Sequence, residues 1–285
     1  MDFISVKAPA KVNLYLHVTG RRPDGYHLLD SLFVFAEDGD VISVRKAEKL
    51  SLRIVGPYAG GLSDGEDNIV LKAARALAEA CGTVPAAEIV LEKNLPVASG
   101  IGGGSSDAAA TLKALMRLWK KDVPAEKLEE IALRLGADVP SCLAAEAVQV
   151  SGIGDILVPA PVLPKLFMLL VNPNKPVSTP AVFKARDPVF SKPSPFVEKI
   201  TDFDAFVEEL KKRHNDLCEA ACRIEPDVRQ VLTVLEKNPF CRFSGMSGSG
   251  GTCFALFASD AEASSAYENL RVEYPNWWFF NTTVE

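Results

Sequence analysis

The sequence lacks the residue patterns of a metal site. Its 285 residues include six cysteines and three histidines, with no Cys-x-x-Cys pair and no histidine at metal-ligand spacing from a cysteine. Cys218 and Cys222 lie one helical turn apart, which is more typical of small side chains on a buried helix face than of two ligands. The cysteines are scattered along the sequence, which favours free thiols, and free thiols are typical of a reducing compartment. We expect no zinc site and a cytoplasmic protein.

Long apolar runs and an excess of basic residues are also missing. No apolar run approaches the roughly 18 residues that cross a bilayer, and residues 1–11 lack the basic start and apolar stretch of a secretory signal. With 31 Lys and Arg against 37 Asp and Glu, the net charge is −6. Nucleic-acid-binding proteins usually present a basic surface. We therefore expect neither a membrane nor a nucleic-acid partner, and any anionic ligand has to be held locally.

A glycine-rich stretch between Leu95 and Leu112 is the clearest functional signal. Its glycines follow a proline, and two serines and Asp107 lead from them into a segment that predicts a helix over residues 108–119. Glycine allows positive φ and lets backbone N–H groups approach an anion, while the following helix adds the positive end of its dipole. The stretch predicts a phosphate cradle, so a polyphosphate is the first ligand to consider.

Two familiar glycine loops do not fit this stretch. A P-loop ends in Gly-Lys-Ser or Gly-Lys-Thr, but here Ser105 follows Gly104. A dinucleotide fingerprint that starts at Gly100 and Gly102 needs a third glycine at position 105. A flexible linker is the remaining alternative, and the apolar strand pattern at residues 89–91 and the helix after the loop disfavour it.

The rest of the pattern predicts an α+β protein with two domains, residues 1–160 and 161–285. The division is placed at the proline-rich segment 159–164. Strands are expected at 12–18, 32–35, 41–44, 89–91, 147–151, 156–158, 166–171, 253–257 and 277–282, with a turn at 37–40. Helices are expected at 68–81, 108–119, 125–135, 203–213, 216–221, 227–236 and 260–274, and residues 136–140 should interrupt the helical pattern.

Two charged residues far apart in sequence suggest phosphoryl transfer. Lys11 stands at the head of a predicted strand, and Asp138 lies among small and apolar neighbours. Phosphoryl transfer needs positive charge on the moving group, alignment and an acceptor for the hydroxyl proton. Lys11 would supply the charge and Asp138 would take the proton, although each alone is also typical of a solvated lysine and a turn aspartate. A second Gly/Ser run at residues 244–252 is either a hairpin turn or a second loop around the ligand.

Four motifs together resemble the GHMP kinase superfamily over residues from about 8 to 257. They are Ala-Pro-Ala-Lys-Val-Asn-Leu at 8–14, Gly-Arg-Arg-Pro-Asp-Gly-Tyr-His at 20–27, Gly-Ile-Gly-Gly-Gly-Ser-Ser-Asp-Ala-Ala at 100–109 and Gly-Ser-Gly-Gly at 248–251. The resemblance implies a two-domain fold of mixed sheets with helices on one face and an active site in the cleft between domains. The Arg-Arg-Pro-Asp-Gly-Tyr-His run resembles the motif of one branch of this superfamily. The resemblance to that branch implies ATP-dependent phosphorylation of the 2-hydroxyl of a cytidine diphosphate-linked methylerythritol, on the non-mevalonate route to isoprenoid precursors.

The resemblance also implies roles for individual residues. Lys11 and Asp138 match the catalytic pair of the family. The ATP phosphates are assigned to Pro96, Val97, Ala98, Ser99, Gly100, Ile101, Gly102, Gly103, Gly104, Ser105 and Ser106, with Asn68 near the adenine or serving as a helix N-cap. The cytidine end is assigned to Asn13, Tyr26, His27, Thr179 and Phe183, since flat aromatic faces suit a pyrimidine.

Several expectations complete this interpretation. Mg²⁺ is expected with ATP, held by phosphates, water and Ser106, because no carboxylate cluster suggests a dedicated metal cage. Gly251 and the Val97-Ala98 start of the loop depart from the residues more usual in the family. The protein is expected to be a monomer or weak homodimer. The alternatives are a sibling kinase for homoserine, mevalonate or galactose, a non-catalytic nucleotide-binding protein, and a nicotinamide oxidoreductase, which the missing third glycine disfavours.

Overall fold

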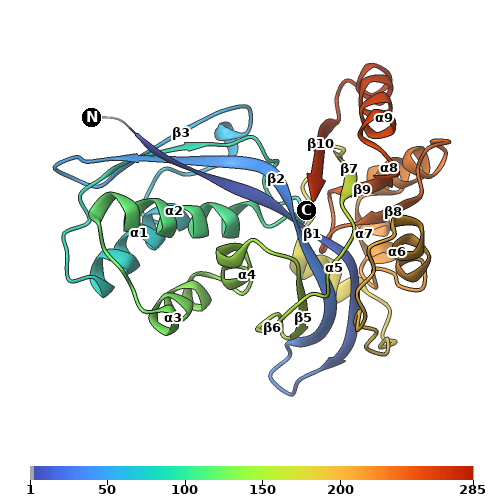
Figure 1. The fold of residues 1–285 in the computed structure, drawn as a ribbon, viewed down its shortest axis with the longest axis horizontal. Helices are drawn as coiled ribbons and strands as arrows, with labels where there is room; N and C mark the ends of the chain where they lie inside the picture. Colours follow the sequence, from blue (N-terminus) through green and yellow to red (C-terminus); the bar gives the residue numbers. More distant parts are fainter. Residues whose placement is uncertain (1–2, 285) are drawn as a thin grey trace. The chain divides into compact units, whose positions relative to one another are not determined.

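The computed structural model describes residues 3–284, and these divide into two compact units (Figure 1). Of the described residues, unit 1 holds 3–11, 38–97 and 102–146, and unit 2 holds 12–37, 98–101 and 147–284. Two long paired strands, β1 (Ile4–Arg21) and β2 (His27–Arg45), contribute to both units. The chain therefore enters and leaves each unit more than once.

Unit 1 combines strands with a layer of helices. β3 (Ser51–Val55) pairs in parallel with β4 (Glu88–Glu92), which pairs antiparallel with residues 41–45 of β2. The helices are α1 (Ile69–Ala80), α2 (Gly103–Trp119), α3 (Ala125–Leu135) and α4 (Val139–Ala144), preceded by a 3₁₀ turn, η1 (Ala59–Gly61). Figure 1 shows α1 and α2 side by side along one face of these strands. Leu77 of α1 and Leu112 and Leu115 of α2 are fully buried, as expected for amphipathic helices on a sheet.

Unit 2 contains antiparallel strands. Residues 29–33 of β2 pair with β5 (Val148–Gly152), and β5 pairs with β6 (Ile156–Pro159). A further sheet has the order β10 (Trp278–Val284), β7 (Leu166–Asn172), β9 (Cys253–Phe257) and β8 (Phe243–Met246). The helices of this unit are α5 (Thr179–Ala185), α6 (Phe203–Leu210), α7 (Cys218–Ile224), α8 (Pro226–Glu236) and α9 (Asp260–Glu273).

The core of unit 2 lies between that sheet and its helices. Alternate residues of β7 and β9, such as Leu169 and Phe257, point to the same face and are completely buried. Helix α8 covers them with Val228 and Leu235, and α9 adds Ala263. Each fully buried Leu, Val or Phe of this kind contributes about 1.5–3 kcal/mol. The sheet and its helices are thus held by one continuous apolar layer.

The α+β class predicted from the sequence is confirmed, and most helices lie within a few residues of their expected bounds. The turn expected at residues 37–40 is wrong, because β2 runs straight through it. Gly39 makes this possible, since a side chain there would overlap the carbonyl oxygen of Ala8 on β1. The interruption expected at residues 136–140 is confirmed at 136–138, between α3 and α4. It ends earlier than expected, because α4 begins at Val139 with Pro140 in its first turn, where proline is tolerated. The short elements β3, η1, α4, α5 and β8 were not expected.

The cysteines agree with the expectations drawn from their spacing. All six cysteines are free thiols. Cys222 lies in the buried cluster of unit 2 and Cys218 packs against it, so both occupy the apolar helix face that their spacing predicts. Across residues 3–284, no helix is both long and apolar enough to span a membrane.

Candidate active site

Lys11 and Asp138, the two residues that suggested phosphoryl transfer, lie together in unit 1. Lys11 is on β1 and Asp138 is the residue before α4, and the lysine Nζ is 3.1 Å from the aspartate Oδ2. The lysine side chain is 5% exposed and the aspartate side chain 33% exposed. The carboxylate is therefore the member of the pair that a ligand from solvent reaches more easily, while the lysine supplies fixed positive charge behind it.

Helix α2 begins inside the glycine loop. Gly102 is its N-cap, in the left-handed region at φ 66°, and it has no side chain with which to cap the first-turn amides. A Cβ at Gly102 would lie 3.1 Å from Cβ and Cε of Lys11. The glycine thus lets the helix N-terminus pack directly on the lysine, which places a helix dipole and an ammonium group at one location suited to an anion.

The start of α2 corrects one detail of the sequence interpretation. Because the helix begins at Gly103 and not near Ala108, Ser105 and Ser106 lie inside its first turns and not ahead of it. The Ser106 hydroxyl donates a 2.7 Å hydrogen bond to the Pro9 carbonyl oxygen and lies 3.3 Å from Sγ of Cys142. Ser106 therefore ties α2 to the part of β1 that carries Lys11. Burial raises the pKa of the neighbouring Cys142 thiol to about 11, so this thiol stays neutral.

A buried ionic cluster of Asp40, Lys93 and Asp107 lies next to the glycine loop. Lys93, just before the loop, contacts the carboxylates of Asp40 on β2 and Asp107 on α2, the latter at 2.8 Å. All three residues are at most 3% exposed. The other oxygen of Asp40 accepts hydrogen bonds from the amides of Asn94 (2.6 Å) and Leu95 (2.9 Å). The cluster therefore fixes both the strand that enters the loop and the helix that leaves it.

Two carboxylates share one lysine in this cluster, which affects their protonation. Burial raises the pKa of Asp107 to about 7; Lys93 lowers it, and the charge of Asp40 raises it further. Burial acts to lower the pKa of Lys93, but the two carboxylates outweigh it and the pKa is raised. Within the described part of the chain, Oδ1 of Asp107 has no hydrogen-bond partner. These observations fit a cluster in which Asp107 is the carboxyl that takes up a proton.

The second Gly/Ser run, residues 244–252, lies in unit 2 against Ser99 and Gly100 of the glycine loop. The Ser247 hydroxyl donates a 2.9 Å hydrogen bond to the Gly100 carbonyl oxygen, and the Thr252 amide donates a 3.0 Å bond to that of Ser99. A Cβ at Gly100, where φ is 77°, would lie 2.6 Å from the Ser247 carbonyl oxygen. The residues after β8 are therefore a turn that supports the first loop by direct backbone contact.

His27 and Phe183, both assigned to the cytidine end, form a stacked pair in unit 2. Their ring centroids are 4.9 Å apart and the planes are inclined by 29°. Thr179, at the start of the same helix as Phe183, shares a 2.6 Å hydrogen bond with the Ser249 hydroxyl. Tyr26 is 62% exposed beside His27. The structure thus brings the ring of His27, at the start of β2, against that of Phe183 on α5.

The other two polar site residues are already engaged by the protein. Asn13 is 2% exposed; its amide group donates to the Ser31 hydroxyl at 3.0 Å, and its backbone N–H donates to the Ser247 hydroxyl. Asn68 is the N-cap of α1, where its Oδ1 accepts from the Val70 amide and its Nδ2 donates to the Ser63 carbonyl oxygen. Both residues therefore organise the backbone, and ligand contacts by them remain predictions.

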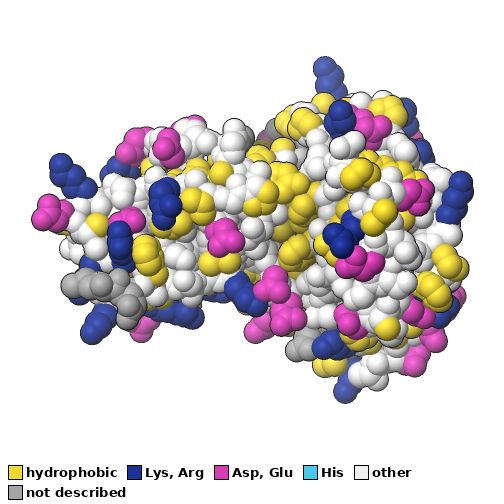
Figure 2. All heavy atoms as spheres, turned by 90° about the horizontal axis from the view of Figure 1, so that it is seen from above, with side chains coloured by type: hydrophobic (Ala, Val, Ile, Leu, Met, Phe, Trp, Pro, Cys, Tyr) yellow, Lys and Arg dark blue, Asp and Glu magenta, His cyan; other side chains and the backbone are white. Residues whose placement is uncertain are grey.

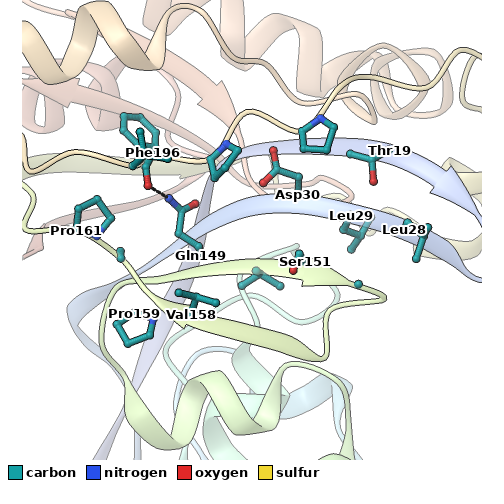
Figure 3. Close-up of a pocket in the computed structure, with 16 residues that line it drawn as sticks. Thr19, Leu28, Leu29, Asp30, Gln149, Ser151, Val158, Pro159, Pro161 and Phe196 are labelled. Carbon is teal, nitrogen blue, oxygen red and sulfur yellow. Dashed lines mark hydrogen bonds between the residues drawn. The ribbon is translucent and has the colours of Figure 1, made fainter.

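A separate cavity of about 790 Å³ lies in unit 2 beside the strand residues that follow His27 (Figure 3). Its polar side chains hold the wall together: Gln149 donates a 2.6 Å hydrogen bond to the Phe196 carbonyl oxygen, and Asp30 accepts from the Ser194 amide and the Tyr15 hydroxyl. Among its lining residues are Thr19, Leu28, Leu29, Val158, Pro159 and Pro161. None of the predicted site residues lines this cavity.

Sequence reasoning missed the ionic cluster of Asp40, Lys93 and Asp107. The signal was present, because Asp40 and Lys93 are charged residues at the ends of apolar strand segments and Asp107 directly follows the glycine loop. Each is also compatible with a solvated strand end or a helix cap, so only the pairing of β2 with β4 reveals that they meet.

A lysine paired with an aspartate and packed on a glycine loop at a helix N-terminus is the kind of arrangement that a small-molecule kinase requires for phosphoryl transfer. The family model of the GHMP kinases N terminal domain matches residues 68–146, and that of the GHMP kinases C terminal domain matches residues 196–276. The chain belongs to the GHMP kinase family, and it is an ATP-dependent phosphotransferase.

Relatives agree with this assignment. The chain is 52% identical over 278 residues to the 4-diphosphocytidyl-2-C-methyl-D-erythritol kinase of Paramagnetospirillum magneticum, which covers 98% of this chain and 97% of that protein. It is also 52% identical to the kinase of the same name from Rhodospirillum rubrum, and this match covers 97% of this chain and 91% of that protein. A crystal structure of 4-(cytidine 5'-diphospho)-2C-methyl-D-erythritol kinase matches with a TM-score of 0.82 and 34% identity over 99% of both chains. A homoserine kinase from Cytophaga hutchinsonii, with a TM-score of 0.68, 19% identity and coverage of 100% and 95%, shares the fold.

Proposed function

We propose that this chain transfers the γ-phosphoryl group of ATP to the 2-hydroxyl of 4-diphosphocytidyl-2-C-methyl-D-erythritol, giving the 2-phosphate and ADP. The observation that carries the chemistry is the position of Lys11, which contacts Asp138 on one side and the Gly102 position of the loop on the other. The substrate is supported by relatives that carry this name and are about half identical to the chain over nearly its whole length.

The proposed step uses the N-terminus of α2 with the loop before it, Asp138 and Lys11. The N-terminus of α2 and the loop before it hold the phosphates of ATP through backbone N–H groups. The acceptor hydroxyl loses its proton to the Asp138 carboxylate as its oxygen forms a bond to the γ-phosphorus. The bond from that phosphorus to the β,γ-bridging oxygen breaks, and ADP leaves with the electron pair. Lys11 stabilises the negative charge that spreads over the transferring group.

Mg²⁺ is proposed to enter with the nucleotide. Within residues 3–284, no group of three or more His, Cys, Asp or Glu side chains could hold a metal ion. Ser106, the expected protein ligand, donates its hydroxyl hydrogen to the Pro9 carbonyl oxygen and keeps its oxygen lone pairs for a metal ion. The described side chains therefore offer no cage, and phosphate oxygens and water are the donors that Mg²⁺ prefers in such a site.

The pyrimidine end of the substrate is assigned to unit 2. His27 and Phe183 provide stacked rings, and exposed Tyr26 beside them provides another aromatic surface. A neutral imidazole carries one donor and one acceptor, which suits the edge of cytosine. Asn13, which is hydrogen-bonded to Ser31 and Ser247, and Thr179, which is hydrogen-bonded to Ser249, are assigned to the same end of the substrate.

The remaining expectations are kept as proposals. We propose a cytoplasmic monomer or weak homodimer that does not bind nucleic acid; on the face drawn in Figure 2, positive and negative side chains are interspersed, and the net charge is −6. The domain division near residue 160 is supported by its place between the two family matches, 68–146 and 196–276.

The direct test is a reaction with a substrate panel. The purified protein is incubated with ATP, Mg²⁺ and 4-diphosphocytidyl-2-C-methyl-D-erythritol, and the product is identified by phosphorus NMR. We expect a new phosphomonoester signal with one ADP formed per product. Homoserine, mevalonate and galactose serve as competing acceptors. Faster ADP release with any of these than with the cytidylated substrate would replace the proposal with that sibling activity, and no ADP release with any acceptor would favour a non-catalytic nucleotide-binding protein.

A further inference from the structure

Two arginines are close in sequence to the stacked His27–Phe183 pair, and both act electrostatically on His27. Arg21, the last residue of β1, folds back over the turn that leads into His27; its Nε donates a 3.1 Å hydrogen bond to the Gly25 carbonyl oxygen. Arg186 follows α5 directly, three residues after Phe183, and its Nη1 donates to the carbonyl oxygens of Asp187 (2.6 Å) and Val189 (3.0 Å). Both guanidinium groups are thus held in place by backbone acceptors.

The orientation of Arg186 is fixed from a second side. Its Cζ lies 4.7 Å from the centroid of the Phe190 ring, a distance at which a guanidinium group is attracted to an aromatic face. The residue is half-buried, whereas Arg21 is exposed at the hairpin. A guanidinium that is already held needs little further ordering to bind a ligand, so less conformational entropy is lost when it does so.

Neither arginine has an acidic partner within ion-pair distance among the described residues. The nearby carboxylates belong to other arginines: Asp24 pairs with Arg22 at 2.7 Å, and Asp187 pairs with Arg223 at 3.3 Å. Arg21 and Arg186 therefore present positive charge that the protein itself does not neutralise. This positive charge affects His27. Burial lowers the pKa of the His27 imidazole, and the charges of Arg186 and Arg21 lower it further.

We propose that Arg21 and Arg186 bind the diphosphate of a pyrimidine nucleotide whose base lies at the His27–Phe183 pair, and so distinguish nucleotide-linked acceptors from free alcohols. This inference rests on the proposed function, because it concerns the cytidine diphosphate part of that substrate. A guanidinium group matches the geometry of phosphate oxygens and keeps its charge at any physiological pH. Burial, together with this positive charge, lowers the pKa of His27 and so favours the neutral imidazole, the form that offers one donor and one acceptor to a base.

The test compares two probes that differ only in the diphosphate. The affinities of cytidine 5'-diphosphate and of cytidine are measured by calorimetry, without ATP, for the wild-type protein, Arg21→Gln, Arg186→Gln and the double variant. We expect the wild-type protein to bind the diphosphate at least tenfold more tightly than the nucleoside. The double variant should lose most of that preference while its affinity for cytidine changes less than twofold. Arg186→Lys, which keeps the charge but not the planar fork, should retain part of the preference.

Arg22→Gln is the matched control, because Arg22 is adjacent in sequence, similarly exposed and already paired with Asp24. It should leave the preference for the diphosphate unchanged. Equal loss of cytidine and diphosphate binding in the double variant, or an unchanged preference, would overturn the inference. Thermal unfolding of each variant shows whether it is folded, and the single variants serve if the double variant is not.

Turnover separates this inference from the proposed function. In an enzyme that phosphorylates the cytidylated substrate, the double variant should show a KM raised about tenfold with kcat within twofold. Wild-type turnover with an unchanged diphosphate preference in the double variant would overturn the arginine site alone. An absence of wild-type turnover, with the preference lost in the double variant, would overturn the proposed function and leave the nucleotide site standing.

Discussion

The Nζ atom of Lys11 lies 3.1 Å from Oδ2 of Asp138, and the same lysine side chain packs against the backbone of Gly102 at the N-terminus of α2. A single buried side chain therefore connects the carboxylate that we propose as the proton acceptor to the loop that we propose as the phosphate site. Because lysine is long and flexible, its enclosure at 5% exposure is what fixes the position of its charge. The separation of roles between an enclosed cation and a more exposed carboxylate follows from this packing.

Asp138→Asn should remove most of the turnover and leave nucleotide binding intact. Asparagine has nearly the same shape but cannot accept the hydroxyl proton as a base, and general base catalysis contributes roughly 100- to 10,000-fold. We expect kcat to fall by at least about 100-fold while the affinity for ATP measured by calorimetry changes little. Asp122→Asn, an exposed change in the same unit, is the control. Near-normal turnover of Asp138→Asn would refute the assignment of this residue as the base.

Gly103 is required for a reason that the sequence alone does not reveal. A Cβ at this position would lie 3.0 Å from Nζ of Lys93 and 3.6 Å from Oδ2 of Asp40, so it would point into the ionic cluster. We expect Gly103→Ala to lower the free energy of unfolding by about 1–3 kcal/mol, since the buried charges have to move. The larger Gly103→Val should in addition weaken ATP binding, because the cluster fixes the loop. Denaturant unfolding and calorimetry measure the two effects.

The next residue of the helix provides the comparison. A Cβ at Gly104 would meet its nearest atom, Cγ2 of Ile69, only at 4.0 Å. Gly104→Ala in the first turn of α2 should therefore leave the unfolding free energy unchanged or raise it by up to about 1 kcal/mol, because alanine reduces the entropy of the unfolded chain. Equal destabilisation by Gly103→Ala and Gly104→Ala would contradict the role given to the cluster.

Local patterns predicted much of this fold, because helix stripes and the short strands around them are properties of neighbouring residues. Lys11 and Asp138 were predicted as partners from their chemistry and from the family resemblance, and their contact agrees with that. The ionic cluster could not be predicted in the same way. Asp40 and Asp107 are separated by many residues, and they meet Lys93 only because β2 pairs with β4 and α2 begins directly after the loop. The start of α2 was misplaced because glycines are poor helix formers, and backbone geometry overrides that preference here.

Asp107 should make the stability of the protein depend on pH in a specific direction. Its pKa is raised from 3.8 to about 7, so between these pH values the folded state holds a proton that the unfolded chain has released. The stability from this group is fully present at low pH and is lost as the pH rises towards 7. The Asp107→Asn variant lacks this pH-dependent loss of stability. Its free energy of unfolding should therefore rise by about 2 kcal/mol relative to that of the wild type between pH 5 and pH 8.

The measurement for Asp107→Asn is a series of denaturant unfolding curves at pH 5, 6, 7 and 8. Groups outside the cluster of Asp40, Lys93 and Asp107 titrate in the same way in both proteins, so their effects cancel in the difference, which reports the titration of the cluster. Asp122→Asn, whose carboxylate is exposed, should run parallel to the wild type across the series. Parallel profiles for Asp107→Asn and the wild type would show that Asp107 is already ionised in the folded protein at pH 5.

Gly251→Ala should destabilise this protein, although alanine is the residue more usual in the family at this position. Gly251 has φ 91°, in the region that disfavours side chains, and its Cβ would lie 3.0 Å from Nδ2 of Asn172 and 3.3 Å from Cα of Ser99. The substitution should cost about 1–2 kcal/mol of unfolding free energy and push on the loop through Ser99, so that ATP binds less tightly. Gly60→Ala, with no atom within 4 Å of the added Cβ and no positive φ, controls for the loss of a glycine. Unfolding curves and ATP calorimetry are measured on both variants. Equal stability and equal ATP affinity of Gly251→Ala and Gly60→Ala would mean that the turn relaxes to the family geometry at no cost. The contact between Ser99 and the second Gly/Ser run would then not position the loop.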